Sequence, residues 1–361
     1  MRADIVIVGA GPAGAFAALA LAPRWRVLVV ERSAGGSPRV GESLIPAARR
    51  LFRDVGLLAS FEAEGHAPWY GNVSSWGGVG EVDFVRDPDG PGWHLDRARF
   101  DAWLLAEARA RGAVVLRPAS VLQAERGEGG WRLRVGFPDD PGELEVHARA
   151  VLDAGGRASR LGPMLGGVRT VDDRLVAGWR HGRGGGEARS AVFAEPDGWW
   201  YTAPLPDNRR VLSFQTDADL PAAADARDPE RLLARARGVP GLDQLVGDTE
   251  WEPGLPAAFV AAHSAALAPA AGPGWAAAGD AALAFDPLSS RGIFNALYTG
   301  FAAAEALDRG LAGGSDAEGA YLQVLARVRA SYQRERVDAY AAETRWAERA
   351  FWGRRVRAGV G

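Results

Sequence analysis

The sequence predicts an α/β fold in which a Rossmann-like domain is interleaved with an antiparallel β-sheet domain and is followed by a C-terminal helical segment. Three observations predict it. A glycine-rich turn joins a short β-branched strand to an Ala-rich helix within residues 4–22, aromatic and β-branched residues dominate 175–216, and the chain becomes apolar and helical after Gly279. The length of 361 residues suits two lobes.

The segments of the two lobes alternate along the chain. We expect strands at Asp4–Val8 and Val27–Val30 around a helix at Pro12–Ala22, and a longer helix at Leu95–Arg111 before a further strand. Strand-like alternation over 121–137 and 144–151 predicts a small antiparallel layer, and helices are expected at 44–55, 229–237, 292–310 and 316–353. The Rossmann-like domain is thus predicted to comprise residues 1–70, 95–165 and 265–310, the β-sheet domain 71–94 and 166–264, and the C-terminal helices 311–361.

The composition excludes several kinds of chemistry. The chain has no cysteine and no lysine, which excludes disulfides, thiolate catalysis and Schiff bases, so any redox chemistry must come from a cofactor. A net charge of −3 gives no electrostatic reason to expect nucleic-acid binding. The five histidines lack metal-ligand spacing, so no metal site is expected.

Two apolar stretches are not expected to meet a membrane. Residues 5–22 are interrupted by Pro12 and by glycines spaced as in a nucleotide-binding turn, and residues 256–285 are interrupted by His263, several prolines and Asp280. We therefore expect no membrane span and a cytoplasmic protein.

The turn after the first strand is the strongest local motif. Gly9-Ala10-Gly11-Pro12-Ala13-Gly14 fits the pattern G-x-G-x-x-G directly after a strand and at the start of a helix. The first glycine permits the tight turn, the second lets the backbone approach a pyrophosphate, and the third lets the helix pack on the strand. Glu31 ends the second strand, where an acid accepts hydrogen bonds from ribose hydroxyls and disfavours a 2′-phosphate. The sequence therefore predicts a dinucleotide cofactor.

A second motif stands near the other end of the chain. Gly279-Asp280 follows a short predicted strand, and Asp286-Pro287-Leu288-Ser289-Ser290-Arg291-Gly292-Ile293 precedes a helix. This pattern resembles the late Gly-Asp motif of FAD-dependent monooxygenases and halogenases, in which the Asp contacts the flavin ribityl chain. The resemblance implies that the cofactor is FAD and that Pro287, Gly292 and Ile293 lie beside the isoalloxazine ring.

Further segments resemble the same family. Arg97-Ala98-Arg99-Phe100-Asp101 is similar to its R-x-x-F-D motif, whose Arg reaches the FAD, and 153–159 is similar to its D-x-x-G-x-x-S segment. The resemblance implies additional cofactor contacts at Arg32, Ser43, Arg97, Val121 and Gly155.

Two segments indicate the branch of the family. Gly41-Glu42-Ser43-Leu44-Ile45-Pro46 resembles the Gly-Glu-Ser/Ala-x-Ile-Pro segment of flavin-dependent halogenases and their relatives, but only Trp199 and Pro204 match the halogenase element W-x-W-x-I-P. Halogenases of this type need a lysine to restrain hypohalous acid, and the chain has none. With the C-terminal residues around Tyr340 and Trp352, the pattern resembles most the halogenase-like monooxygenases that modify tryptophan during the biogenesis of quinone cofactors.

The resemblance implies an FAD-dependent monooxygenase that hydroxylates an electron-rich aromatic ring, an indole or a phenol, through a C4a-hydroperoxyflavin. The electrons would come from NAD(P)H or from a partner flavin reductase, the oxygen from O₂, and the ring from a small molecule or from a tryptophan of a peptide or partner protein. Candidate catalytic residues are Glu42, Trp200 and Tyr201, and Phe214 and Phe285 are further candidates for the substrate lining. The aromatic residues could equally be core residues of a sheet, and Glu42 could be the carboxylate at a helix N-terminus.

Three other functions remain open at this point. An FAD-dependent reductase of alkene or polyprenyl substrates would share the N-terminal and R-x-x-F-D motifs but would consume no oxygen. A flavin-dependent halogenase is disfavoured because lysine is absent. A non-catalytic flavoprotein that assists the maturation of another protein would accept electrons but yield no oxygenated product.

Overall fold

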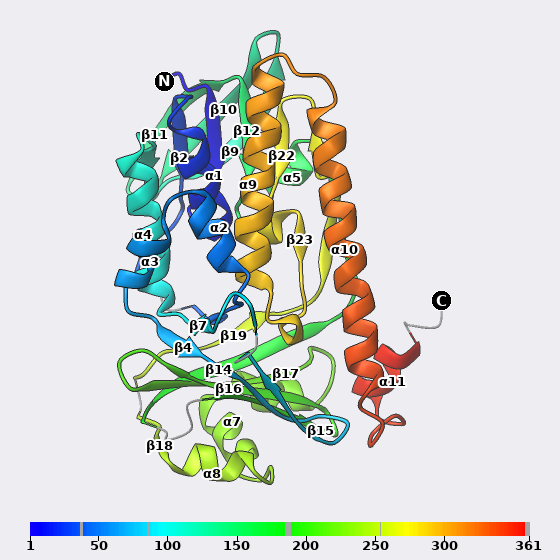
Figure 1. Cartoon of the computed structure of the whole chain (residues 1–361). Helices are drawn as coiled ribbons and strands as arrows, with labels where there is room; N and C mark the ends of the chain where they lie inside the picture. The colour runs from blue at the N-terminus through cyan, green and yellow to red at the C-terminus, as the bar shows by residue number, and fades with distance from the viewer. Residues whose placement is uncertain (37–38, 85–86, 185–188, 253, 358–361) are drawn as a thin grey trace.

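A parallel sheet forms the centre of the upper half of the molecule (Figure 1). The computed structural model describes residues 1–36, 39–84, 87–184, 189–252 and 254–357. The sheet has the strand order β21-β22-β12-β1-β2-β8, and all neighbours are parallel except β21 and β22. Its strands are β1 (Ile5–Val8), β2 (Val27–Val30), β8 (Val114–Leu116), β12 (Ala150–Asp153), β21 (Ala271–Gly272) and β22 (Trp275–Ala277).

Helices from distant parts of the chain cover this sheet. They are α1 (Pro12–Leu21), α4 (Arg97–Ala110) and α9 (Gly292–Leu311). α1 and α9 touch through their backbones, since a Cβ atom on Gly300 would lie 2.4 Å from the Ala13 carbonyl oxygen. This close approach places the beginning of α1 beside the middle of α9.

The lower half is an eight-stranded, mainly antiparallel sheet, which we call the second sheet. Its order is β18-β14-β17-β16-β15-β5-β6, with β19 also paired to β14, and only β15 and β5 are parallel. The strands are β5 (Gly71–Ser75), β6 (Val79–Asp83), β14 (Leu175–Gly184), β15 (Ser190–Glu195), β16 (Gly198–Leu205), β17 (Arg209–Asp217), β18 (Thr249–Glu250) and β19 (Ala257–Ala261).

The two faces of the second sheet contact different parts of the molecule. Because side chains alternate along a strand, Trp200 and Phe214 pack in one core with the short helices α6 (Ala222–Arg227), α7 (Pro229–Ala236) and α8 (Leu242–Gly247). Trp199 packs on the other face in a core with Tyr340 and Trp352. We call the face that carries Trp199 the inner face, because the Rossmann-like half lies on that side, whereas α7 and α8 lie below the sheet (Figure 1).

Smaller layers complete the fold. The antiparallel order β11-β10-β9, the order β13-β20-β23 and the order β3-β7-β4 are separate three-stranded sheets. Their elements and the remaining short helices are β3 (Ser43–Leu44), β4 (Ala67–Trp69), β7 (Gly92–His94), β9 (Ser120–Gly127), β10 (Gly130–Phe137), β11 (Asp140–Ala148), β13 (Val168–Val171), β20 (Ala265–Ala268), β23 (Leu283–Ala284), α2 (Ala48–Asp54), α3 (Leu58–Ala63), α5 (Leu161–Met164) and the 3₁₀ turns Gly279–Ala281 and Pro287–Ser289.

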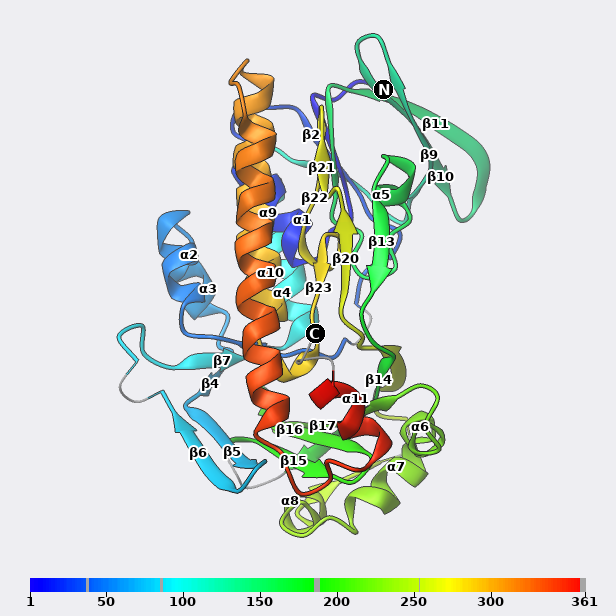
Figure 2. The same ribbon diagram turned by 90° about the vertical axis from the view of Figure 1, so that its right-hand side faces the viewer.

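Two C-terminal helices connect the halves. α10 (Ala317–Ala341) runs beside α9 and down to the second sheet, where α11 (Ala350–Arg357) lies (Figures 1 and 2). Phe351 and Trp352 of α11 are completely buried, and the Trp352 indole donates a hydrogen bond of 2.9 Å to the Glu195 carbonyl oxygen. α11 therefore closes the core on the inner face.

The predicted fold class is confirmed, and one local expectation needs correction. The segment 44–55 is not one helix: Ser43–Leu44 form β3, and α2 begins only at Ala48, because a helix does not readily extend back through a proline such as Pro46. The helices expected over 316–353 are α10 and α11. Among the described residues, no helix could cross a membrane and no group of His, Asp or Glu side chains could hold a metal ion.

Candidate functional site

The three glycines of the turn between β1 and α1 differ in their surroundings: two are tightly packed and one faces open space. A Cβ on Gly9, whose φ is +103°, would lie 2.3 Å from the Ala154 carbonyl oxygen, and one on Gly14 would lie 1.9 Å from the Gly9 carbonyl oxygen. A Cβ on Gly11 would meet only the Arg39 guanidinium at 3.9 Å. The first and third glycines are therefore required by packing, whereas the second faces free space at the N-terminus of α1, where backbone N–H groups attract phosphate.

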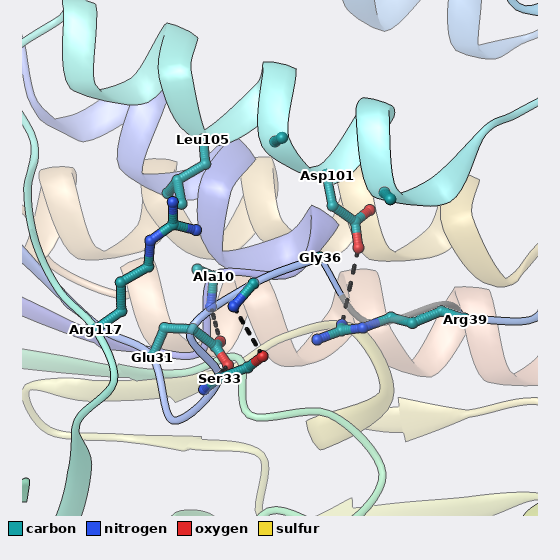
Figure 3. A pocket seen from close by; sticks show the side chains of 11 residues that line it. Ala10, Glu31, Ser33, Gly36, Arg39, Asp101, Leu105 and Arg117 are labelled. Atoms are coloured by element: carbon teal, nitrogen blue, oxygen red, sulfur yellow. Dashed lines mark hydrogen bonds and ion pairs between the residues drawn. The ribbon is translucent and has the colours of Figure 1, made fainter. Parts of the chain in front are cut away.

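Glu31 stands beside this turn, at the end of β2. The Ala10 N–H donates a 2.7 Å hydrogen bond to Glu31 Oε2 and the Ser33 N–H a 2.8 Å bond to Oε1, which fixes the carboxylate at the mouth of a pocket (Figure 3). The pocket is open to solvent and is lined by Ala10, Glu31, Ser33, Gly35, Gly36, Arg39, Ala98, Asp101, Ala102, Leu105 and Arg117. Its position beside the turn suits the adenosine half of a dinucleotide.

Two of the expected cofactor residues lie near this pocket but do not line it. Arg32 follows Glu31 and is exposed. Val121 is half-buried on β9 and packs against the core of the Rossmann-like half. The segments that carry Arg32 and Val121 are joined by a hydrogen bond: the Ala119 N–H, just before β9, donates to the Glu31 carbonyl oxygen, just after β2, at 2.8 Å.

The late Gly-Asp motif contacts the first turn. Gly279 has a φ of +58°, its N–H donates to Thr299 Oγ1 at 2.9 Å, and a Cβ there would lie 2.9 Å from Ala13 Cβ. The neighbouring Asp280 carboxylate forms a 3.2 Å ion pair with Arg157 and remains partly exposed. Residues 13 and 279, far apart in sequence, are thus brought into contact.

Gly155 lies near the first glycine turn, since a Cβ on Gly9 would come within 2.9 Å of its nitrogen. Its N–H donates to Asp153 Oδ1 at 3.0 Å, and the buried Asp153 also accepts hydrogen bonds from Ser159 Oγ and the Gly162 N–H. Burial raises the pKa of Asp153, although these hydrogen bonds oppose the shift. The loop after β12 is therefore fixed by a buried carboxyl group.

The segment before α9 forms another edge of the candidate site. Asp286 is buried, accepts a hydrogen bond from the Leu288 N–H at 2.9 Å and another from the Tyr340 hydroxyl at 2.7 Å, and burial raises its pKa. Pro287 and Gly292 are exposed, and Ile293 is buried. No side chain caps α9, so its first N–H groups remain available for an electron-rich group.

Arg97 holds the loop that carries Glu42. Its guanidinium donates to the Gly41 carbonyl oxygen at 2.8 Å and pairs with Asp101 at 3.2 Å. Burial opposes the charge of Arg97, but Asp101, Glu42 and Asp280 hold its pKa above the ordinary value. Arg97 therefore lies within the electrostatic reach of Glu42 and Asp280, two other residues that the motifs indicated.

Two consecutive residues of this loop contact the inner face of the second sheet. The Ser43 and Tyr201 hydroxyls share a hydrogen bond of 2.6 Å, and Glu42 Oε1 lies 3.5 Å from Nε2 of His181. Glu42 and His181 are both buried. Burial, together with the charge of Glu42, raises the pKa of Tyr201 well above its usual value, so Tyr201 stays protonated. Of the three candidate catalytic residues, the structure brings Glu42 and Tyr201 together.

Trp200, the third candidate catalytic residue, does not lie near Glu42 and Tyr201. It lies on the outer face of the sheet, stacks on Phe214 with 4.6 Å between ring centroids, and donates to Glu195 at 3.0 Å. Phe214 is therefore also remote from Glu42, and Phe285 is buried against Tyr332 with 4.3 Å between ring centroids. Because alternate residues face opposite sides of a strand, the inward neighbours of Trp200 are Trp199 and Tyr201.

Sequence reasoning missed two inner-face residues, Trp179 and His181, which lie two positions apart on β14. The strand register places Trp179 opposite Ser213, which in turn lies opposite Tyr201. Their rings approach to 5.0 Å between centroids, and both side chains are buried. The period of two along β14 would have put these two residues on one face, but only the pairing of β14, β17 and β16 shows that Tyr201 shares it.

The residues present fit FAD. Gly11, Gly156 and Gly292 border free space into which a Cβ would project, whereas Gly9, Gly14 and Gly279 are in tight contact with other parts of the chain. The open glycines occur at the N-terminus of α1, at the loop after β12 and at the N-terminus of α9, which are the places where an extended dinucleotide would approach the backbone.

Comparison with known proteins agrees with this arrangement. Residues 2–314 match the family model described as FAD binding domain. LodB of Marinomonas mediterranea, named as an FAD-dependent oxidoreductase, is 31% identical over 98% of this chain and 96% of its own. The myxobacterial chondrochloren halogenase CndH has a similar structure, with a TM-score of 0.86 and 25% identity over 98% of this chain and 86% of its own.

A third similar structure is that of QhpG, described as a peptidyl tryptophan dihydroxylase essential for tryptophylquinone cofactor biogenesis. It aligns with a TM-score of 0.75 and 25% identity over 98% of this chain and 79% of its own. The chain therefore belongs to the FAD binding domain family and is a flavoenzyme related to FAD-dependent oxidoreductases and halogenases.

Proposed function

We propose that this flavoenzyme is a monooxygenase that hydroxylates an electron-rich aromatic ring, an indole or a phenol, and that the favoured substrate is a tryptophan of a peptide or partner protein. The observation that carries the proposal is the contact of Glu42 and Ser43 with the inner face of the second sheet, next to Tyr201 and Trp179. Aromatic side chains can stack a substrate ring at this boundary between the two halves.

In this proposal the chain's own residues bind, orient and exclude water. The N-termini of α1 and α9 and the carboxylate of Glu31 hold the cofactor, while Arg97 keeps the Glu42 loop in place. When bound and reduced by NAD(P)H or by a flavin reductase, FAD supplies electrons that activate O₂ for transfer to the ring. Tyr201, protonated and hydrogen bonded to Ser43, contributes a fixed aromatic wall.

The similarity to QhpG supports a tryptophan held within a peptide, since QhpG is described as a peptidyl tryptophan dihydroxylase. A neighbour with 20% identity, an anhydrotetracycline hydroxylase, shares the fold alone. The substrate of this chain is thus proposed from one related enzyme together with the aromatic character of the inner face.

The test is an oxygen-incorporation experiment. The FAD-loaded protein is reduced by NADH or a flavin reductase in isotopically labelled O₂ with indoles, phenols and tryptophan-containing peptides. We expect a product that has gained one or two labelled oxygen atoms. A saturated alkene product formed without oxygen uptake would assign the chain to the reductases, and flavin reduction without any oxygenated product would support a non-catalytic maturation partner.

A further inference from the structure

The Glu42 and His181 side chains form a buried polar pair at the boundary between the two halves. Glu42 is 2% and His181 is 4% exposed, and Glu42 Oε1 lies 3.5 Å from Nε2 of His181. Glu42 is further held by the Gly41 N–H, which donates to Oε2 at 2.9 Å, and Gly41 is itself fixed by Arg97. The carboxylate therefore approaches the imidazole from a well-anchored loop.

The contact determines which nitrogen of His181 can act on a ligand. A carboxylate accepts hydrogen bonds and does not donate them, so in the neutral imidazole the contact places the proton on Nε2 and leaves a lone pair on Nδ1. The distance is long for a hydrogen bond, as is common for catalytic pairs before a substrate binds. Nδ1 is buried and has no hydrogen-bond partner among the described residues.

A second buried polar atom lies beside it. The indole nitrogen of Trp179, also on the inner face, has no hydrogen-bond partner in the part of the chain that the structure describes. The Trp179 and His181 rings are 5.0 Å apart between centroids. Buried donors and acceptors in folded proteins are almost always paired, so one unpaired acceptor and one unpaired donor side by side point to a ligand that supplies the complementary groups.

We propose that His181, positioned by Glu42, accepts a hydrogen bond from the ring N–H or O–H group of the aromatic substrate and takes the proton of a phenol O–H, while Trp179 donates a hydrogen bond to an acceptor on the same molecule. On a phenol the proton moves to Nδ1, the electron pair of the broken O–H bond stays on the substrate oxygen, and the Glu42 carboxylate balances the imidazolium charge; on an indole the N–H bond stays intact and the hydrogen bond alone raises the electron density of the ring. The electron-rich ring that results is the better acceptor of an electrophilic oxygen. This assignment rests on the proposed function for its substrate class.

The experiment uses para-nitrophenol, whose ionised form absorbs visible light, and the FAD-loaded, oxidised protein without any electron donor. The spectrum of the bound probe reports its ionisation directly, so the result does not depend on turnover. We expect wild-type protein to raise the ratio of bound phenolate to phenol by roughly tenfold over that in buffer. His181→Gln should abolish this shift, and Glu42→Gln should weaken it because the imidazolium loses its counter-charge.

His66→Gln is the matched control. His66 is also a buried histidine, but it packs against Phe61 and Phe100 in the core of the Rossmann-like half, and its substitution should leave the probe spectrum as in wild type. In turnover assays, His181→Ala should lower kcat about 100-fold or more, and added imidazole should restore part of it. FAD content and the unfolding transition of each variant verify that it is folded.

Two results would overturn the assignment. One is a wild-type protein that fails to bind para-nitrophenol or binds it without ionising it, and the other is a folded His181→Gln variant that ionises the probe as wild type does. Oxygen incorporation by wild type together with either result would leave the proposed monooxygenase intact. A normal probe shift without any oxygenated product would instead overturn the monooxygenase and retain the role of His181.

Discussion

The three glycines of the first turn are required for different reasons. Gly9 and Gly14 have no room for a side chain because carbonyl oxygens lie 2.3 and 1.9 Å from the Cβ positions. Gly11 has a φ of −69°, which any residue can adopt, and free space around its Cβ position. Only a ligand at the N-terminus of α1 gives Gly11 a reason to be glycine.

We therefore expect Gly11→Val to fold normally and to lose FAD. In cofactor-free protein, its free energy of unfolding should stay within about 0.5 kcal/mol of wild type, since among the described residues the new Cβ would meet only the Arg39 guanidinium, at 3.9 Å. Gly14→Ala should instead lose about 3 kcal/mol or more from backbone overlap. Urea unfolding and flavin absorbance measure the two effects, and a Gly11→Val protein with full FAD occupancy would contradict the assignment.

At the same scale, the side to which an aromatic residue points was beyond sequence reasoning. Trp199, Trp200 and Tyr201 are adjacent and all suit a strand, but which of them meets Glu42 depends on which face of the sheet turns toward the Rossmann-like half. His181 carried no motif at all, and its pairing with Glu42 arises from residues 139 positions apart. Long-range pairing of this kind leaves no local pattern.

Among the elements, α11 has an effect out of proportion to its length of 8 residues. Its Phe351 and Trp352 side chains fill the core on the inner face together with Trp199 and Tyr340. Tyr340 in turn donates a hydrogen bond to Asp286 in the turn before α9. Packing of the last helix is therefore connected to the loop expected beside the flavin.

Substitution on the two sides of α11 separates these contributions. Trp352→Ala should lower the free energy of unfolding by about 3–5 kcal/mol, because it empties a fully buried site and removes the hydrogen bond to Glu195. Val356→Ala, at a site that is 39% exposed, should change it by no more than about 0.5 kcal/mol. Equal losses in denaturant titrations of the two variants would show that α11 does not anchor this core.

Elements with strong local patterns were predictable, and short ones were not. The βαβ unit at the N-terminus and α4 lie within a few residues of the predicted ranges, since the glycine-rich turn marks the first and hydrophobic periodicity the second. β3 has only two residues, and it exists because it pairs with β7. No local propensity indicates so short a strand, which is why 44–55 was assigned to one helix.

For the molecule as a whole, the absence of lysine is the property that bears most directly on the type of reaction. The similar structures include a halogenase, and halogenation chemistry of that type was expected to need a lysine. We therefore predict that no halide enters the product. Reactions with reduced flavin, O₂ and chloride or bromide, run beside a lysine-containing halogenase, are analysed by mass spectrometry, and a flavin-dependent chlorinated or brominated product would disprove this.

The contact of Ala13 with Gly279 and Gly300 has a consequence for how the protein is made. The ribosome synthesises the first turn well before Gly279 and α9. The sheet around this turn is also completed late, because β1 pairs on one side with β2 but on the other side with the much later β12. A nascent chain stalled before residue 279 would carry the glycine turn without its opposite wall. We therefore expect the flavin to bind only after residue 279 and α9 have been synthesised, and the bound cofactor to stabilise the completed domain.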